Sequence, residues 1–143
     1  EMSYQTGTLE AFLGRNSILE LAKKELRKFP QSSLKQIKKY DVADIQKAAD
    51  EGDELASKVL EQCGVFLGIG IASAMNLLDI PTAVIGGGIG KSSILVKSAK
   101  ANAINRVLPS LIKPFEILNA KFDSDTGVIG AALLGKGQLE EEF

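Results

Sequence analysis

The alternation of apolar and polar positions predicts a chain built mainly of helices. Apolar residues recur every three or four positions, and a glycine, a proline or a capping residue separates one run from the next. Helices are expected over residues 8–12, 17–29, 42–49, 53–78, 92–108 and 127–134. Residues 1–7 and the polar connection 31–39 should be irregular, and the tail 136–143, which has no apolar periodicity, should be frayed.

Individual residues predict how some of these helices begin and which side they bury. Ser17 followed by Glu20 forms a capping-box pattern, which places the start of the second helix. Asp41 is a suitable N-cap for the third. In the helix 92–108 the residues expected to face inward are Ile94, Ala101, Ile104 and Leu108.

The longest helix, 53–78, is amphipathic at first and then apolar on every side, which predicts that it enters the core. Gly64, Gly68 and Ala72 are four residues apart and form a stripe that lets another element approach closely. Cys63 continues the buried stripe and is interpreted as a small core residue. The uncharged part of this helix is shorter than the roughly 20 residues of a membrane span, so a helix buried on all sides in a soluble domain is expected.

Two segments favour strands, namely the β-branched run Thr82–Ile85 and the stretch Phe115–Lys121. Two strands do not make an independently stable parallel sheet. We therefore expect further strands that this pattern misses, or strands supplied by another chain or by a segment outside these residues.

A glycine turn, Gly86–Gly90, follows the first strand and precedes a helix that Ser92 or Ser93 can cap. Glycine allows positive φ and lets a ligand approach the backbone, while a helix N-terminus attracts phosphate. The turn therefore predicts nucleotide binding, although a turn of this kind can also serve only to connect a strand to a helix.

Two common phosphate motifs do not match this turn. The P-loop pattern G-x-x-x-x-G-K-[ST] ends correctly at Gly90-Lys91-Ser92, but Ile85 stands where its first glycine belongs. The dinucleotide pattern G-x-G-x-x-G begins at Gly86 and is broken by Lys91.

Composition narrows the chemistry that the chain can perform. The 143 residues have a net charge of −1, one cysteine and no histidine. The absence of histidine removes Ser/His and Cys/His nucleophiles and the usual zinc ligands. The polar N-terminus EMSYQTGT is unlike a signal peptide, so a cytoplasmic chain is expected.

Residues 23–39 carry seven basic side chains and one acid, a local net charge of +6. No aromatic residues alternate with these lysines to stack bases. We interpret the segment as a solvated surface and expect no direct nucleic-acid binding by it.

Five motifs, in order along nearly the whole chain, resemble the ROK family of sugar kinases and sugar-responsive repressors. Gly7–Ala11 is similar to the family's G-C-L-E-A, and Ala48–Asp53 to its A-x-x-G-D helix junction. Gly68–Asp79 is similar to L-G-x-x-x-A-x-x-x-N-x-x-D. Val84–Ile89 is similar to the adenosine motif V-I-G-G-G-[VI], and Gly127–Leu133 to G-x-x-G-A-A-x-L.

This resemblance implies an α/β fold, the distal part of an actin-like, ribonuclease-H-like ATPase domain, with residues 1–143 as one C-terminal lobe. It implies an ATP-dependent sugar kinase that transfers a phosphoryl group from ATP, with Mg²⁺, to a hexose hydroxyl. The alternative is the sugar-sensing lobe of a ROK repressor whose DNA-binding helix-turn-helix would precede residue 1. A nucleotide-binding or interaction domain unrelated to this family is a third hypothesis.

The resemblance also assigns candidate site residues. Glu10 takes the role of the family's sugar-binding glutamate, and Gly86, Gly87, Gly88 and Ile89 lie along the adenosine and phosphate side of the nucleotide. Without the resemblance, Glu10 is simply an exposed carboxylate in the first turn of a helix.

The chain departs from the family pattern at the zinc segment, whose cysteines would fall at Glu1, Ser3 and Thr8, so no zinc is expected. The family's N-terminal phosphate motif and catalytic Asp have no counterpart here, so no catalytic residue is assigned. We expect these residues alone to be inactive, and expect the missing half, a partner chain or homo-oligomerisation to complete the assembly.

Overall fold

The computed structural model describes residues 7–121 and 125–141, and the side chains of Ile89, Thr126 and 137–141 are outside that description. The expectations for residues 1–6, including the positions Glu1 and Ser3, lie outside the described residues. The elements in chain order are α1 (Leu9–Leu13), α2 (Arg15–Glu25), η1 (Leu26–Lys28), η2 (Ser33–Gln36), α3 (Val42–Asp50), α4 (Glu54–Leu78), β1 (Thr82–Ile85), η3 (Gly88–Lys91), α5 (Ser93–Ile104), α6 (Pro109–Ile112), β2 (Glu116–Asn119) and α7 (Thr126–Glu141).

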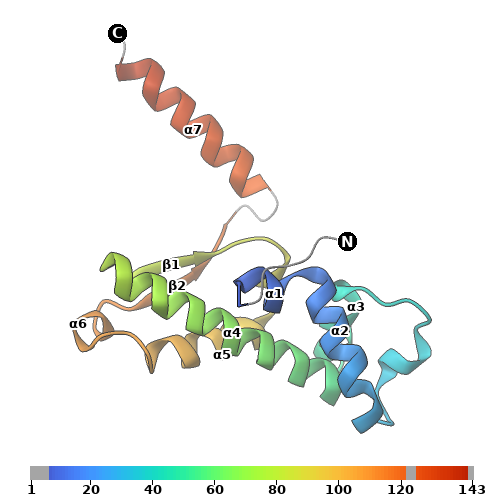
Figure 1. Cartoon of the computed structure of the whole chain (residues 1–143). Helices are drawn as coiled ribbons and strands as arrows, with labels where there is room; N and C mark the ends of the chain where they lie inside the picture. Colours follow the sequence, from blue (N-terminus) through green and yellow to red (C-terminus); the bar gives the residue numbers. More distant parts are fainter. Residues whose placement is uncertain (1–6, 122–124, 142–143) are drawn as a thin grey trace.

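Helix α4 connects two hydrophobic cores (Figure 1). Its first half packs with α1, α2 and α3, where Leu55, Val59 and Cys63 are buried. Its second half packs with α5 and the two strands, where Ala72 and Met75 are buried. The expected entry of this helix into the core is therefore confirmed.

Helices α4 and α5 touch through glycine, as the small-residue stripe predicts. A Cβ atom added to Gly64 would lie 2.5 Å from the carbonyl oxygen of Leu95. One added to Gly68 would lie 2.6 Å from the carbonyl oxygen of Ala99. Backbone meets backbone at both places, so no side chain fits between the helices.

This contact corrects the expected buried side of α5. Ile104 and Leu108 are 39% and 50% exposed, and Ala101 is also exposed. The residues that face the core are Leu95, Val96, Ala99 and Ala103. Of the residues expected to face inward, only Ile94 packs against a core, and it is partly buried. The prediction is wrong for the others because the close approach to the glycines of α4 requires small residues and backbone at the contact.

Asn76 fixes the far end of the same helix pair. Its amide nitrogen donates to the carbonyl oxygen of Arg106 at 2.9 Å, and its amide oxygen accepts from the N–H of Leu108 at 2.9 Å. One side chain on α4 therefore satisfies two backbone groups that follow α5.

The two strands form a parallel sheet in which Val84 pairs with Leu118 and Ile85 with Asn119. Ile85 and Ile117 face the helices and are buried. Val84 and Leu118 face the other way and are 62% and 42% exposed. Parallel sheets are normally covered on both faces. In the described part of the chain, only the face that carries Ile85 and Ile117 is covered.

Helix α4 is not buried on all sides, contrary to expectation, because Leu77 and Leu78 near its end are 84% and 62% exposed. It is the one helix among the described residues that is long and apolar enough to cross a membrane by length and composition. Its buried residues pack in both cores, which is the pattern of a core helix in a folded domain.

Several helix ends also differ from the prediction. Helix α5 ends at Ile104 rather than at residue 108, and α2 ends at Glu25, after which η1 continues to Lys28. Helix α2 begins at Arg15 with Gly14 as N-cap, because the carbonyl oxygen of Gly14 already accepts from the N–H of Ile18, and the hydroxyl of Ser17 donates to Glu10 O instead of capping. Helix α7 continues to Glu141 rather than ending at residue 134. The Lys, Gln, Leu and Glu residues of the expected frayed tail are good helix formers and extend the preceding turns; residues 142–143 lie outside the description.

Helix α7 stands away from the rest of the chain (Figure 1). Its apolar side chains lie open, with Val128, Leu133 and Leu134 exposed by 73%, 64% and 77%. Such a helix gains little from tertiary burial within this chain.

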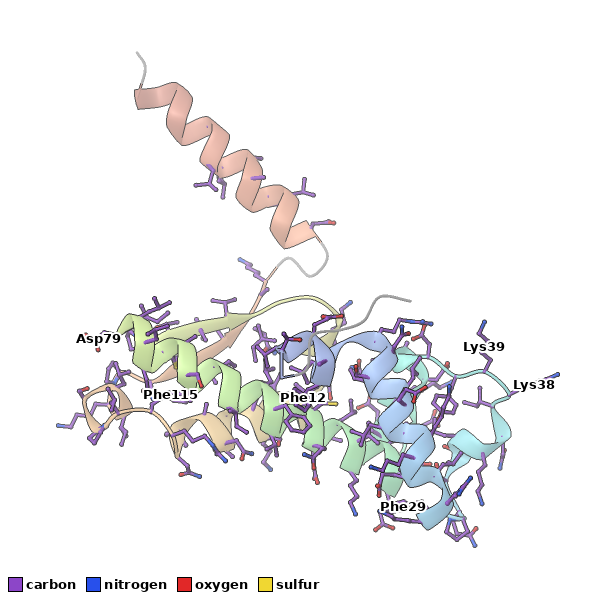
Figure 2. All side chains as sticks on the ribbon, in the orientation of Figure 1. Phe12, Phe29, Lys38, Lys39, Asp79 and Phe115 are labelled. Carbon is purple, nitrogen blue, oxygen red and sulfur yellow. The ribbon has the colours of Figure 1, made fainter. Side chains whose placement is uncertain are left out.

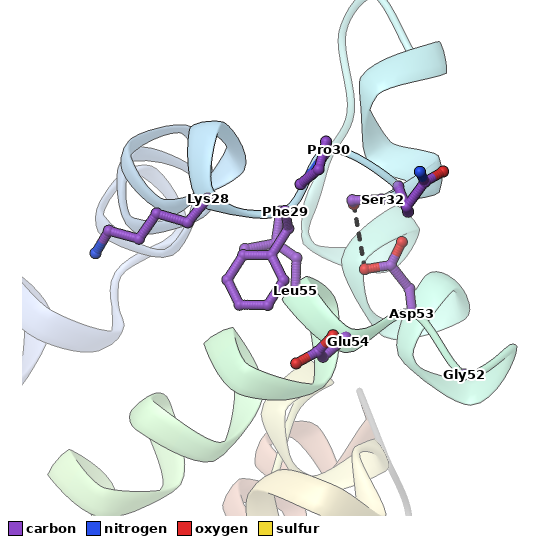
Figure 3. A pocket seen from close by; sticks show the side chains of 9 residues that line it. Lys28, Phe29, Pro30, Ser32, Gly52, Asp53, Glu54 and Leu55 are labelled. Carbon is purple, nitrogen blue, oxygen red and sulfur yellow. Dashed lines mark hydrogen bonds between the residues drawn. The ribbon is translucent and has the colours of Figure 1, made fainter.

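Asp53 joins the start of α4 to the loop after α2 (Figure 3). Its carboxylate accepts from the N–H of Ala56 at 3.0 Å as the N-cap of α4, and from the N–H of Ser33 at 2.7 Å. The hydroxyls of Ser32 and Ser33 donate to it as well. Burial opposes ionisation of Asp53, but these donors outweigh that effect and lower its pKa.

We predict that Gly68→Ala destabilises the fold by about 1–3 kcal/mol, the usual cost of overpacking, although alanine normally favours a helix by about 1 kcal/mol. The measurement is the urea-unfolding midpoint. Gly130→Ala in α7 is the matched control, because nothing lies within 4 Å of an added Cβ there. A Gly68→Ala variant as stable as the control would show that the helices have room for a methyl group.

We also predict that Asp53→Asn lowers stability at pH 7 by about 1–3 kcal/mol through the loss of charge-assisted hydrogen bonds. A lowered pKa in the folded state stabilises the fold above the ordinary carboxyl pKa, and this contribution is lost as the pH falls through the folded pKa. The difference from wild type should therefore shrink in acid. The exposed Asp50→Asn serves as control, and an equal deficit at pH 7 and pH 3 would contradict the ionised cap.

Candidate functional site

The glycine turn has a positive φ at one position and a close backbone contact at another, and both require glycine. Strand β1 ends at Ile85, and Gly87 then takes a φ of +72°, a conformation that other residues rarely adopt. A Cβ atom on Gly90 would lie 3.0 Å from the carbonyl oxygen of Ile85, so the chain folds back tightly. Ser92, which is buried, then caps α5 by accepting from the N–H of Leu95 at 3.2 Å. The expected strand, turn and capped helix are confirmed.

A hollow of about 340 Å³ opens between this turn and the end of the second strand. Its lining residues are Ile85, Gly86, Gly87, Gly90, Lys91, Asn119 and Ala120. The N–H of Ala120 donates to the carbonyl oxygen of Ile85 at 2.8 Å and holds the two strand ends together. Carboxyl ends of parallel strands are the usual ligand-binding edge of an α/β sheet.

The four predicted turn residues do not all reach this hollow. Gly86 and Gly87 line it, whereas Gly88 is exposed beside open space and is not among its lining residues. The backbone of Ile89 lies in η3, and its side chain is outside the description. Their role in nucleotide binding stays a prediction.

Lys91 and Asn119 line this hollow, although the sequence pattern does not assign them to the site. The pattern predicts a second strand that runs on to Lys121, with Asn119 inside it, but the strand ends at Asn119. A signal was present, because residues at the carboxyl ends of two parallel strands come to the same edge. For Lys91 the sequence offers only the two incomplete phosphate motifs, the P-loop ending that it matches and the dinucleotide pattern that it breaks.

Glu10 belongs to helix α1 and not to the turn between β1 and α5. It is exposed in the first turn of α1, whose N-cap Thr8 accepts from the N–H of Ala11 at 3.3 Å. The rings of Phe12 and Phe66, 4.5 Å apart, pack α1 against α4, and Figure 2 places Phe12 between the two helices. Glu10 is not among the residues that line the hollow beside the glycine turn.

A second hollow, of about 370 Å³, lies beside Asp53 (Figure 3). Phe29, Ser32 and Glu54 are among its lining residues. Both oxygens of Asp53 already accept hydrogen bonds from the protein, so this carboxylate serves the fold. We therefore interpret this hollow as a surface feature of the helix junction.

The other side chains that could react or bind a ligand lie in the core or on the open surface. Burial raises the pKa of the Cys63 thiol to about 11, which keeps it protonated and inert. In the described ranges 7–121 and 125–141, no three His, Cys, Asp or Glu side chains gather to hold a metal ion. Lys38 and Lys39 of the basic segment project outward from the loop before α3 (Figure 2).

The chain resembles sugar kinases in sequence. A glucokinase of Halalkalibacterium halodurans is 32% identical over 139 residues, which cover 94% of this chain and 42% of the relative. The chain thus spans less than half the length of this relative.

Solved structures share the fold over most of the chain. An inferred sugar kinase from Cytophaga hutchinsonii matches 89% of this chain and 43% of its own with a TM-score of 0.82 and 25% identity. A ROK-family transcriptional regulator, a homologue of the E. coli MLC protein, matches 92% of this chain and 34% of its own with a TM-score of 0.81 and 28% identity. A ROK glucokinase from Streptomyces griseus, solved with glucose and AMPPNP, matches 91% of this chain and 45% of its own with a TM-score of 0.76, but at 20% identity it shows the fold alone.

The family model that matches the chain is that of the ROK family, over residues 5–138. Kinases and regulators both appear among the similar proteins, and the solved structures of both kinds share the helix-rich α/β fold of this chain. The chain belongs to the ROK family.

Proposed function

We propose that this chain is the C-terminal lobe of an ATP-dependent ROK sugar kinase, which transfers a phosphoryl group from ATP to a hydroxyl of a hexose. The observation that carries the proposal is the glycine turn at the carboxyl end of the parallel strands, beside a hollow that a ligand can enter. The 32% identity to a glucokinase across 94% of the chain supports the same activity.

The nucleotide would bind along the glycine turn. Gly86, Gly87 and Gly88 have no Cβ atoms to obstruct a ligand, and beside Gly87 and Gly88 the space is open to at least 4 Å. The backbone of Ile89, in η3, would continue this wall. ATP would arrive with Mg²⁺, which offsets phosphate charge, but no carboxylate lines this hollow among the described residues, so the magnesium ligands would come from elsewhere in the assembly.

The hexose would bind through Glu10. A carboxylate accepts hydrogen bonds from two neighbouring hydroxyls, and the exposed position of Glu10 on a helix anchored against α4 leaves its oxygens available to a ligand. Because Glu10 is absent from the lining of the turn hollow, a hexose held by Glu10 would lie outside that hollow.

The exposed apolar surfaces support an incomplete assembly. Val84 and Leu118 lie uncovered on one sheet face, and Leu133 and Leu134 lie uncovered on α7. A further segment or partner chain that adds strands would bury them, and the relatives are more than twice as long as this chain. We propose that the general base belongs to that other part, so this chain alone does not catalyse transfer.

The second candidate function is the sugar-sensing lobe of a ROK repressor. The observation that favours it is the TM-score of 0.81 and 28% identity to a ROK regulator. The coding sequence upstream of Glu1 separates the two: a phosphate motif and an Asp base favour the kinase, and a helix-turn-helix favours the repressor.

We predict that Glu10→Gln, in an enzyme that joins this chain to the rest of the kinase, raises the KM for hexose by about 10-fold or more. Losing hydrogen bonds to a charged acceptor costs about 1.5–3 kcal/mol, and 1.4 kcal/mol is tenfold. Steady-state kinetics with hexose and ATP varied in turn should show the KM for ATP unchanged.

Glu20→Gln is the matched control, since Glu20 is another exposed carboxylate on a neighbouring helix. An unchanged KM for hexose in Glu10→Gln would remove Glu10 from the sugar site. An equal effect of both substitutions would assign the change to surface charge.

A further inference from the structure

The hollow beside the glycine turn has the chemistry of an anion site. Among its described lining residues, Lys91 is the one charged side chain and no carboxylate is present. Asn119 contributes a side-chain amide from the other strand end. The remaining lining consists of glycine backbone, Ala120 and the largely buried Ile85.

The same lining is poorly suited to a nucleobase. Bases are held by stacking on aromatic or broad apolar walls. No aromatic residue lines the hollow, and its apolar side chains are those of Ile85, which is 7% exposed, and Ala120. A phosphate group needs N–H donors and positive charge instead, which an ammonium, an amide and an open glycine backbone provide.

We propose that Lys91 and Asn119 hold a phosphate group of the bound nucleotide in this hollow, while the adenosine lies outside it. The inference rests on the proposed nucleotide binding. It adds that the phosphate is the part of the ligand that enters the hollow, and that Lys91 and Asn119 are the side chains that bind it. Lys91 comes from η3 and Asn119 from the end of β2, so a phosphate there bridges the two strand ends.

The backbone at this place is fixed before a ligand arrives. The hydrogen bond from the Ala120 N–H to Ile85 O sets the position of Asn119 against the turn. The tight fold at Gly90 sets the position of Lys91. A Cβ atom on Gly86 would meet only the methyl group of Ala120 at 3.6 Å, so a phosphate oxygen can approach the backbone from the open side.

The test is equilibrium binding to the 143-residue chain by calorimetry, with ADP, adenosine, inorganic phosphate and glucose 6-phosphate as probes. We expect ADP to bind at least about 10-fold more tightly than adenosine, and inorganic phosphate to compete with ADP. Lys91→Met should weaken ADP about 10-fold or more and Asn119→Ala about 3-fold, whereas Lys91→Arg should keep most of the affinity. None of these substitutions should change adenosine binding.

Lys100→Met, an exposed lysine on α5, is the matched control, and circular dichroism checks that every variant is folded. Adenosine binding as tightly as ADP, or ADP binding that Lys91→Met and Asn119→Ala leave unchanged, would overturn the inference and leave nucleotide binding intact. No binding of ADP or adenosine to the wild type would overturn the proposed nucleotide site together with it. Tighter binding of glucose 6-phosphate than of ADP would assign the hollow to a sugar phosphate and overturn the nucleotide assignment.

Discussion

The structure depends on the direct backbone contact between α4 and α5 at Gly64 and Gly68. A methyl group at either glycine would come within 2.6 Å of a carbonyl oxygen of α5, so the contact admits no larger residue without movement of a helix. This contact fixes the rotation of α5 and brings Ala99 and Ala103 to the core. Helix α4 also packs with α1, α2 and α3, so the helix that carries these two glycines belongs to both cores.

The candidate site is a consequence of this packing. Strand β1 leaves α4 and leads into the glycine turn, and α5 returns from the turn to lie against α4. The turn is thereby held between two fixed elements, and the parallel pairing with β2 brings Asn119 to the same edge. One face of the sheet and the apolar side chains of α7 stay exposed in this framework, and these are the surfaces that the assembly proposed above would cover.

Much of this arrangement was predictable from local rules. The bounds of α4, the N-cap Asp41, the strand before the glycine turn and the stripe of small residues all follow from periodicity and capping. The buried side of α5 did not, because it depends on contact with glycines some 30 positions earlier in the chain, and single-helix periodicity favours the larger Ile104. The place of Asn119 in the candidate site was not predictable for a similar reason. Asn119 lies near Gly86 only because the two strands pair. The roles of Glu10 and Ile89 came from family resemblance and stay predictions.

We propose above that the glycine turn of this ROK-family chain binds a nucleotide at the carboxyl ends of the parallel strands. The most direct measurement is the ¹H–¹⁵N correlation spectrum of the chain during titration with ADP, because each backbone amide reports its own surroundings. We expect saturable shifts centred on Gly86, Gly87, Lys91 and Asn119, with the amides around Asp53 unchanged. Shifts confined to the Asp53 hollow, or none at saturating ADP, would contradict the account.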